Sequence, residues 1–296
     1  MSSTIPTSRS NPAWLRPPSS SLDLWQCLAL LAAVNSVAMA YQVIEVEFAV
    51  LVGLIWIGAF LCLEDRLPNL KPEPSHTSLL LGSLLLLACL WRTSVVFHQD
   101  VAAYALVPLQ GIALALLLAP ASQLLSWREP LLVLCVLPAV LLLHQFIPIQ
   151  ALMHGTAQVS AALMKLIGQD VLLEGTAVWL PGGGVNVNPS CSGRNTISQL
   201  FAVAAIFVVA FPLRQRWLSL LLLALSPLVG FLGNCLRIAS LALINSSDWA
   251  EKKYWFDFFH ESEGSLVFAA ISVSVFAWGY LKIMDRQLAA REAQHA

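Results

Sequence analysis

Eight long apolar segments constrain this chain of 296 residues more than any other feature. A helix needs about 20 mostly apolar residues to cross the hydrocarbon core of a bilayer, so each segment is a candidate span. The second is short for a span, and no internal repeat relates the eight. The candidate spans are residues 22–44, 48–63, 77–97, 101–120, 130–149, 195–213, 217–245 and 264–284.

The composition also indicates a membrane protein. Hydrophobic residues make up 58% of the chain and charged residues only 11%, which is far from the balance of a soluble domain. The net charge of −1 gives no reason to expect nucleic acid or another polyanion as a partner. We therefore predict an all-α polytopic membrane protein with about eight transmembrane helices.

The two ends of the chain differ from this membrane domain. Residues 1–20 are rich in Ser and Pro and hold little that could form a core, which predicts a disordered cytoplasmic tail. The membrane domain then covers residues 21–286, and residues 287–296 form a second cytoplasmic tail. The sequence AMA at residues 38–40 resembles a signal-peptide cleavage site, but the apolar stretch before it is longer than a signal core, which favours an uncleaved anchor.

The distribution of Lys and Arg predicts the orientation, because these residues concentrate on the cytoplasmic side. With the N-terminus inside, ten basic residues of the connecting segments lie inside and three outside, so both termini are expected in the cytoplasm. The inner set is Arg9, Arg16, Arg66, Lys71, Arg128, Arg214, Arg216, Lys282, Arg286 and Arg291, and the outer set is Lys165, Lys252 and Lys253.

Residues 150–193 form the longer outward segment, which we predict to be a small extracytoplasmic cap. Within it, residues 151–168 have the periodicity of an amphipathic helix that lies at the membrane interface. Residues 171–188 alternate in polarity and are interrupted by Pro181 and three glycines, as in a β-hairpin. This cap leads directly to Cys191.

Cys191 is the one cysteine of six that stands outside the apolar runs. The other five lie within them, where cysteine behaves as a small hydrophobic residue. No spacing typical of zinc ligands occurs, so we expect no metal and no cofactor. Asn188 and Ser190 are suited to cap a helix that begins near Cys191, and Pro189 suits its first turn.

The surroundings of Cys191 favour the reactive thiolate. A thiol at the start of a helix lies at the positive end of the helix dipole, and Arg194 is placed over the same helix face. A packed cysteine beside an arginine that extends to the membrane surface explains the stretch equally well. From these residues alone, both interpretations stay open.

Arg237 interrupts an apolar span, where a charged residue is costly and therefore suggests a function. It lies about 30 Å from Trp217 at 1.5 Å per residue, which places it near the outer end of the span, level with Cys191. A structural arginine paired with a carboxylate is the alternative. Arg237 belongs to a polar stripe that is expected to face the bundle interior. The stripe comprises Ser226, Gly230, Asn234, Arg237 and Ser240.

His260 lies just outside the last span, close in sequence to three carboxylates that could orient it, Asp257, Glu261 and Glu263. A single histidine at a membrane interface is usually unremarkable. The expected depth changes this view, because the topology predicts His260 on the same side of the membrane as Cys191.

Cys191, Arg237 and His260 together would support acyl transfer. Cys191 would be the nucleophile, His260 the base that activates it and the acid that protonates the leaving amine, and Arg237 the fixed cation for thiolate or oxyanion.

Three short blocks resemble the signatures of the exosortase/archaeosortase family of multi-pass membrane transpeptidases. They are CSG at residues 191–193, GNCLRI at 233–238 and HESEG at 260–264. The stretch 166–193 also resembles the segment that precedes the family's cysteine, so the likeness covers about residues 100–284. Each block is weak alone, but their order, spacing and topology together are specific.

The resemblance implies an enzyme of the bacterial cytoplasmic membrane that processes sorting signals of the PEP-CTERM kind. Its partners would be membrane lipid and substrate proteins that end in a short motif, a transmembrane helix and a basic tail. It would cleave near the motif at the outer membrane face and pass the acyl group from a cysteine thioester to an acceptor. The family's Cys, Arg and His correspond to Cys191, Arg237 and His260.

Four further residues are expected to bind substrate or assist the reaction: Arg194, Asn234, Ser192 and Glu261. The residue that follows the family's CSG is commonly apolar, whereas here it is Arg194. We expect Arg194 to influence which motif is recognised.

Two other classes of protein compete with this interpretation. A non-enzymatic transport or assembly protein could use Arg237 to line a substrate path, although transporters place polar sites near the midplane and carry repeats. A protease or acyltransferase of another family would need a GxSxG elbow, an HExxH motif or paired intramembrane aspartates, and none of these occurs.

Overall fold

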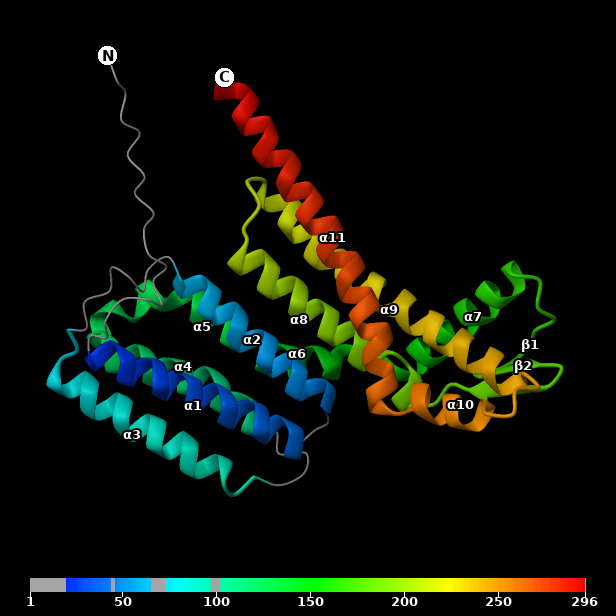
Figure 1. Cartoon of the computed structure of the whole chain (residues 1–296), viewed down its shortest axis with the longest axis horizontal. Coiled ribbons are helices and arrows are strands. Elements are labelled where there is room, and N and C mark those ends of the chain that lie inside the picture. Colours follow the sequence, from blue (N-terminus) through cyan, green and yellow to red (C-terminus); the bar gives the residue numbers. More distant parts are fainter. Residues whose placement is uncertain (1–19, 44–45, 65–72, 97–101, 296) are drawn as a thin grey trace, which may run out of the picture.

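The computed structural model describes residues 20–43, 46–64, 73–96 and 102–295. Helices α1 to α6 form one group, beside which α8, α9 and α11 cross, while α7, the strands and α10 gather at the far end of α9 (Figure 1). The first group comprises α1 (Ser20–Val43), α2 (Val46–Glu64), α3 (His76–Thr93), α4 (Ala103–Leu118), η3 (Ala121–Trp127), α5 (Arg128–Leu134) and α6 (Val136–Phe146). The second comprises α7 (Ile149–Leu166), β1 (Leu172–Glu174), β2 (Ala177–Leu180), β3 (Gly183–Asn186), η4 (Pro189–Cys191), α8 (Arg194–Ala210), α9 (Arg216–Ser246), α10 (Lys252–His260) and α11 (Ser262–His295).

The predicted all-α membrane fold is confirmed. Within the described residues, six helices are long and apolar enough to cross a membrane: α1, α2, α3, α8 with η4, α9 and α11. All eight predicted spans are helical, but α4, at 16 residues, is short for a crossing. The predicted tail 1–20 lies almost wholly outside the described residues, and the predicted tail 287–296 continues α11 as far as His295.

The predicted span 130–149 is broken into α5 and α6. The stretch Ala121–Leu134, which is η3 with α5, meets α6 at an angle of 44°. Pro138 explains the break. A proline has no backbone N–H and its ring collides with the carbonyl four residues earlier, which here is that of Leu134, the last residue of α5.

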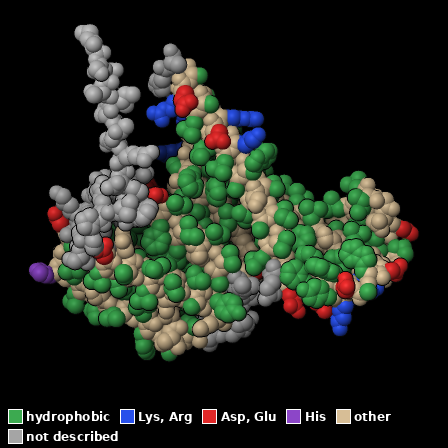
Figure 2. Space-filling view, in the orientation of Figure 1, with side chains coloured by type: hydrophobic (Ala, Val, Ile, Leu, Met, Phe, Trp, Pro, Cys, Tyr) green, Lys and Arg blue, Asp and Glu red, His purple; other side chains and the backbone are tan. Residues whose placement is uncertain are grey.

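The outer surface is mostly hydrophobic along the helices, as a lipid-facing surface must be. Figure 2 shows hydrophobic side chains over the bundle, with charged side chains gathered near the C-terminal end of α11 and at the end where α10 lies. This distribution agrees with a multi-pass membrane protein.

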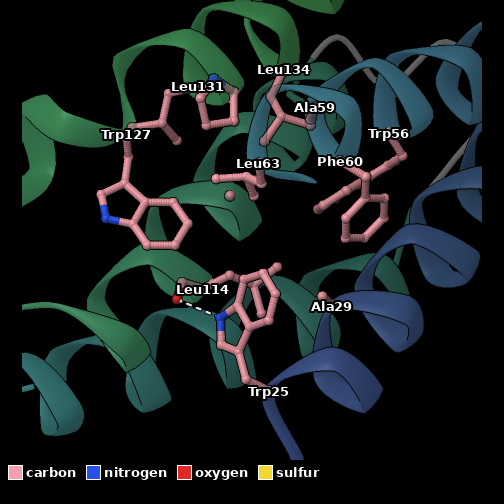
Figure 3. Close-up of a pocket in the computed structure, with 12 residues that line it drawn as sticks. Trp25, Ala29, Trp56, Ala59, Phe60, Leu63, Leu114, Trp127, Leu131 and Leu134 are labelled. Atoms are coloured by element: carbon pink, nitrogen blue, oxygen red, sulfur yellow. Dashed lines mark hydrogen bonds between the residues drawn. The ribbon is translucent and has the colours of Figure 1, made fainter. Parts of the chain in front are cut away.

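The core of the first helical group includes three tryptophans, Trp25, Trp56 and Trp127 (Figure 3). The indole N–H of Trp25 donates a hydrogen bond to the carbonyl of Leu114 at 2.9 Å, which joins α1 to α4. The cavity between these rings has a volume of about 20 Å³, enough for one small group and far too small for a peptide.

The predicted cap is an amphipathic helix followed by a three-stranded antiparallel sheet, which has one strand more than the expected hairpin. Helix α7 turns its small residues, such as Ala157 and Ser160, toward α9 and leaves Leu166 exposed. The sheet lies tight against the end of α9, since a Cβ on Gly182 would stand 2.3 Å from the carbonyl oxygen of Ser246. The run of glycines therefore allows strand and helix to approach closely.

The predicted polar stripe of α9 does face the protein interior. Ser226, Gly230, Asn234 and Arg237 are buried, and only Ser240 is partly exposed. Arg237 is 7% exposed, so its charge lies within the protein and needs hydrogen-bonding partners.

Candidate active site

Cys191 ends the short turn η4, which joins the sheet to α8. The side chain of Asn188 caps this turn, because its Oδ1 accepts a hydrogen bond from the backbone N–H of Cys191 at 3.0 Å. Gly193 follows in the left-handed conformation (φ +90°), and α8 begins at the next residue. Cys191 thus lies just ahead of the long helix instead of within its first turn, and its side chain is 2% exposed.

Asn234 of α9 hydrogen-bonds to the turn that contains Cys191. Its Nδ2 donates a hydrogen bond to the carbonyl oxygen of Cys191 at 3.0 Å. The turn can come this close because residue 193 is glycine, whose added Cβ would lie 2.6 Å from the same Nδ2 atom. A buried amide and a glycine in a left-handed conformation therefore fix the backbone of Cys191.

His260 is the last residue of α10, and its Nε2 lies 3.5 Å from the Sγ of Cys191. The imidazole stacks on Phe256, one turn earlier in the same helix, with ring centroids 5.5 Å apart and planes 14° apart. This ring contact holds the imidazole in position, and the distance to sulfur allows a proton to pass between the two side chains.

Arg237 reaches from α9 to the end of α10. Its Nε donates to the carbonyl of Phe259 at 3.0 Å, and its Nη2 donates to the carbonyl of His260 at 2.6 Å. The last carbonyls of a helix lack partners within the helix, so the guanidinium completes the end of α10. Its Nη1 group donates to no other described residue, and Arg237 is within electrostatic range of Cys191.

These three side chains line one cavity of about 130 Å³. Five described helices contribute to its wall, together with η4. The lining residues are Glu47, Ser190, Cys191, Asn195, Thr196, Asn234, Arg237, His260, Glu261 and Ser265.

Sequence reasoning missed Glu47, which enters this wall from α2. One carboxylate oxygen accepts a hydrogen bond from Gln199 of α8 at 3.1 Å, and the other accepts one from Ser265 of α11. A carboxylate at the very start of an apolar span was the available signal. Nothing in the sequence placed that end beside Cys191, since 144 positions separate the two residues.

Two of the predicted auxiliary residues lie elsewhere. Ser192 is fully buried, and its hydroxyl donates to the carbonyl of Pro189 at 2.8 Å within the turn. Arg194 is not part of the cavity wall; it is in electrostatic range of His144 on α6, and its Nε is buried without a hydrogen-bond partner among the described residues.

The two described carboxylates near His260, those of Asp257 and Glu261, do not hold its ring. Glu261 lines the cavity but is exposed, and Asp257 is exposed one turn away. Neither hydrogen-bonds to the imidazole, and the side chain of Glu263 lies outside the described part of the structure. Among the described residues, the ring of Phe256 stacks on the imidazole of His260 and orients it, a role for which the sequence suggested a carboxylate.

A thiol, an imidazole and a guanidinium around one cavity are side chains that suit acyl transfer. Within the described ranges, no group of three or more His, Cys, Asp or Glu side chains could hold a metal ion. The described cysteines are all free thiols.

Comparison with known protein families agrees with this geometry. Residues 19–277 match the family described as transmembrane exosortase, a stretch that covers both helical groups and the whole cavity wall. No curated protein and no solved structure matches the sequence. Because the family match spans most of the chain, the protein belongs to the transmembrane exosortase family.

Proposed function

We propose that this protein is a membrane-embedded cysteine transpeptidase that cleaves C-terminal sorting signals of proteins destined for the cell surface. The observation that carries the proposal is the 3.5 Å approach of Cys191 Sγ to His260 Nε2 in a cavity that Arg237 also lines. Membership of the exosortase family supports the same conclusion.

The reaction begins when His260 takes the proton of the Cys191 thiol. The thiolate attacks the carbonyl carbon of the scissile peptide bond, and the resulting oxyanion is stabilised by the free N–H groups of Arg237. The tetrahedral species collapses to a thioester as the C–N bond breaks, and His260 returns its proton to the leaving amine. An acceptor nucleophile then attacks the thioester, gives up its proton to His260 and releases the thiolate.

Arg237 contributes in two ways under this proposal. Two of its N–H groups hold the carbonyls of Phe259 and His260, which fixes the base, and those of Nη1 remain to stabilise negative charge. A transport protein that used Arg237 to line a path would not need its guanidinium committed to the end of α10.

The substrate is proposed to be a protein whose own transmembrane helix follows the scissile bond. The site lies where the end of α10 and the start of α11 meet the C-terminal half of α9 (Figure 1). A substrate helix in the bilayer would present a bond just beyond its end at this depth. We place the site on the extracytoplasmic face of a bacterial cytoplasmic membrane, with both termini in the cytoplasm.

The test is to co-express the protein with a candidate substrate that carries a C-terminal sorting tail and to follow its cleavage. Cys191→Ala should abolish processing, because no other described thiol lies in the cavity. Cys89→Ala is the matched control, since Cys89 is equally buried but lies within α3. Processing by Cys191→Ala at the wild-type rate would refute the enzymatic proposal.

A further inference from the structure

Among the described residues that line the cavity, Glu47 is the acidic side chain that comes from the first helical group. It stands in the first turn of α2, whereas the thiol, the base and the arginine belong to η4, α10 and α9. The sequence signatures of the site lie entirely in the second half of the chain. Through Glu47, the first helical group contributes a side chain to the cavity.

Both carboxylate oxygens of Glu47 are engaged with helices that border the cavity. Oε2 accepts a hydrogen bond from Nε2 of Gln199, a residue only 8% exposed, and Oε1 accepts one from the hydroxyl of Ser265, 5% exposed. Neither donor carries a charge. A carboxylate that accepts hydrogen bonds from two buried neutral groups is held in a defined place.

The charge of Arg237 gives this carboxylate a role beyond fastening helices. Arg237 is 7% exposed, and its two hydrogen bonds end on neutral carbonyl groups, which do not cancel a positive charge. A buried cation needs an opposite charge nearby to offset its loss of hydration. Among the described residues, Glu47 and Cys191 are acidic groups in electrostatic range of the guanidinium, and both line the same cavity as Arg237.

We propose that Glu47 is a positioning residue whose carboxylate is the counter-charge of Arg237 in the resting enzyme. The pair leaves little net positive charge beside the sulfur until His260 takes the proton of Cys191. Without the carboxylate, the positive charge of Arg237 would act on the sulfur without compensation and would stabilise the thiolate more strongly. A more strongly stabilised thiolate is a poorer nucleophile toward a peptide carbonyl. Glu47 thereby adjusts the reactivity of the cysteine, an inference that rests on the proposed role of Cys191.

The effect of the charge can be separated from the effect of the hydrogen bonds, because only loss of the charge should make Cys191 react faster. Glu47→Gln removes the negative charge, so a larger fraction of the Cys191 side chain should be thiolate at neutral pH. Gln199→Leu and Ser265→Ala each remove one hydrogen bond but leave the carboxylate in place. Glu64→Gln makes the same chemical change at the opposite, exposed end of α2 and serves as the matched control.

The experiment measures the rate at which iodoacetamide alkylates Cys191 in the purified full-length protein at neutral pH and low salt. Mass spectrometry of the peptide that contains Cys191 distinguishes it from the other cysteines. Glu47→Gln should raise the rate about threefold to tenfold. The Gln199→Leu, Ser265→Ala and Glu64→Gln variants should remain within about twofold of wild type, since their net cavity charge is unchanged.

Three outcomes would overturn the proposal: an unchanged rate in Glu47→Gln, a lower rate, or the same increase in Gln199→Leu or Ser265→Ala. Should Glu47→Gln fail to fold, Glu47→Asp and Glu47→Asn repeat the comparison one methylene shorter, with and without the charge. Alkylation needs no substrate, so this result stands even if the protein cleaves no sorting signal, and cleavage by Cys191→Ala tests that function separately.

Discussion

The Sγ atom of Cys191 lies 3.5 Å from the Nε2 atom of His260, although 69 positions separate the two residues in the chain. The contact joins a short turn ahead of α8 to the last residue of α10. Neither element is long, and neither could hold its residue in place alone. The contact therefore depends on the residues that anchor each element, and these can be changed one at a time.

Removing the imidazole should slow the reaction of Cys191 with alkylating reagents. In His260→Ala the thiol loses the base 3.5 Å away, so alkylation at neutral pH should slow at least about tenfold and substrate cleavage should fall by about 10²- to 10⁴-fold. His154→Ala is the control, because His154 is exposed on α7 and its ring bonds only to the carbonyl of Gln150. If His260→Ala is alkylated at the wild-type rate, His260 is not the activating base.

The ring of Phe256 should affect cleavage by orienting the imidazole of His260. Phe256→Leu keeps an apolar side chain but loses the stacking contact, so the imidazole becomes less well oriented. Aromatic pairs contribute about 0.5–1.5 kcal/mol, and cleavage should therefore fall about twofold to tenfold. Phe256→Tyr should retain most activity, and Tyr254→Leu, which changes an exposed ring of the same helix, should retain all of it.

A purely packing role for Phe256 would give a different pattern. The melting temperature of Phe256→Leu would fall, while the alkylation rate of Cys191 in the folded protein would equal that of wild type. Measuring both quantities on the same sample distinguishes packing from orientation of the base.

Arg237→Lys tests whether charge alone suffices at this position. Lysine keeps the charge but cannot donate from two fixed nitrogens to the carbonyls of Phe259 and His260 at once. We expect cleavage to fall by about 10²-fold or more and the melting temperature to drop, as the end of α10 loses its partners. Arg286→Lys, an exposed change on α11, should have no effect. Full activity in Arg237→Lys would show that only the charge is needed.

Gly193→Ala should damage the site more than backbone strain alone would. Gly193 and Gly168 have similar positive φ angles, +90° and +82°, so alanine at either position costs about 1–2 kcal/mol of backbone energy. At Gly168 the new Cβ meets nothing within 4 Å, whereas at Gly193 it lies 2.6 Å from Nδ2 of Asn234.

The comparison of these two variants isolates the contact with Asn234. Thermal unfolding should show a small loss for Gly168→Ala and a clearly larger loss for Gly193→Ala, with cleavage reduced only in the latter. Equal behaviour of the two would mean that the close packing of turn and α9 is unimportant for the site.

Local patterns in the sequence predict the membrane helices and the meeting of three side chains. Each span is a continuous apolar run, and the stripe that contains Asn234 and Arg237 follows helical spacing, so both can be derived from neighbouring residues. The break after α5 could also have been predicted, because Pro138 and the carbonyl of Leu134 are only four residues apart. The sequence interpretation treated that stretch as one span, and the structure shows that the stretch is bent.

Contacts between distant segments could not be derived in this way. Glu47 joins the cavity only because α2 packs against α8, and no periodicity within α2 contains that information. His260 is oriented by an aromatic ring where carboxylates were expected, since a polar side chain at an exposed helix end can turn toward water. Arg194 lies within electrostatic range of His144 on α6 and does not line the cavity, which depends on how distant helices pack together.

The two hydrogen bonds that reach from α9 to the site have a mechanical consequence. Asn234 holds the carbonyl of Cys191 and Arg237 holds that of His260, and these two anchors stand three residues apart on one face of a single helix. One turn of α9 therefore fixes the distance between the sulfur of Cys191 and the imidazole nitrogen of His260. If α9 tilts or slides, Cys191 and His260 should both move with it, and the distance between their side chains should be preserved.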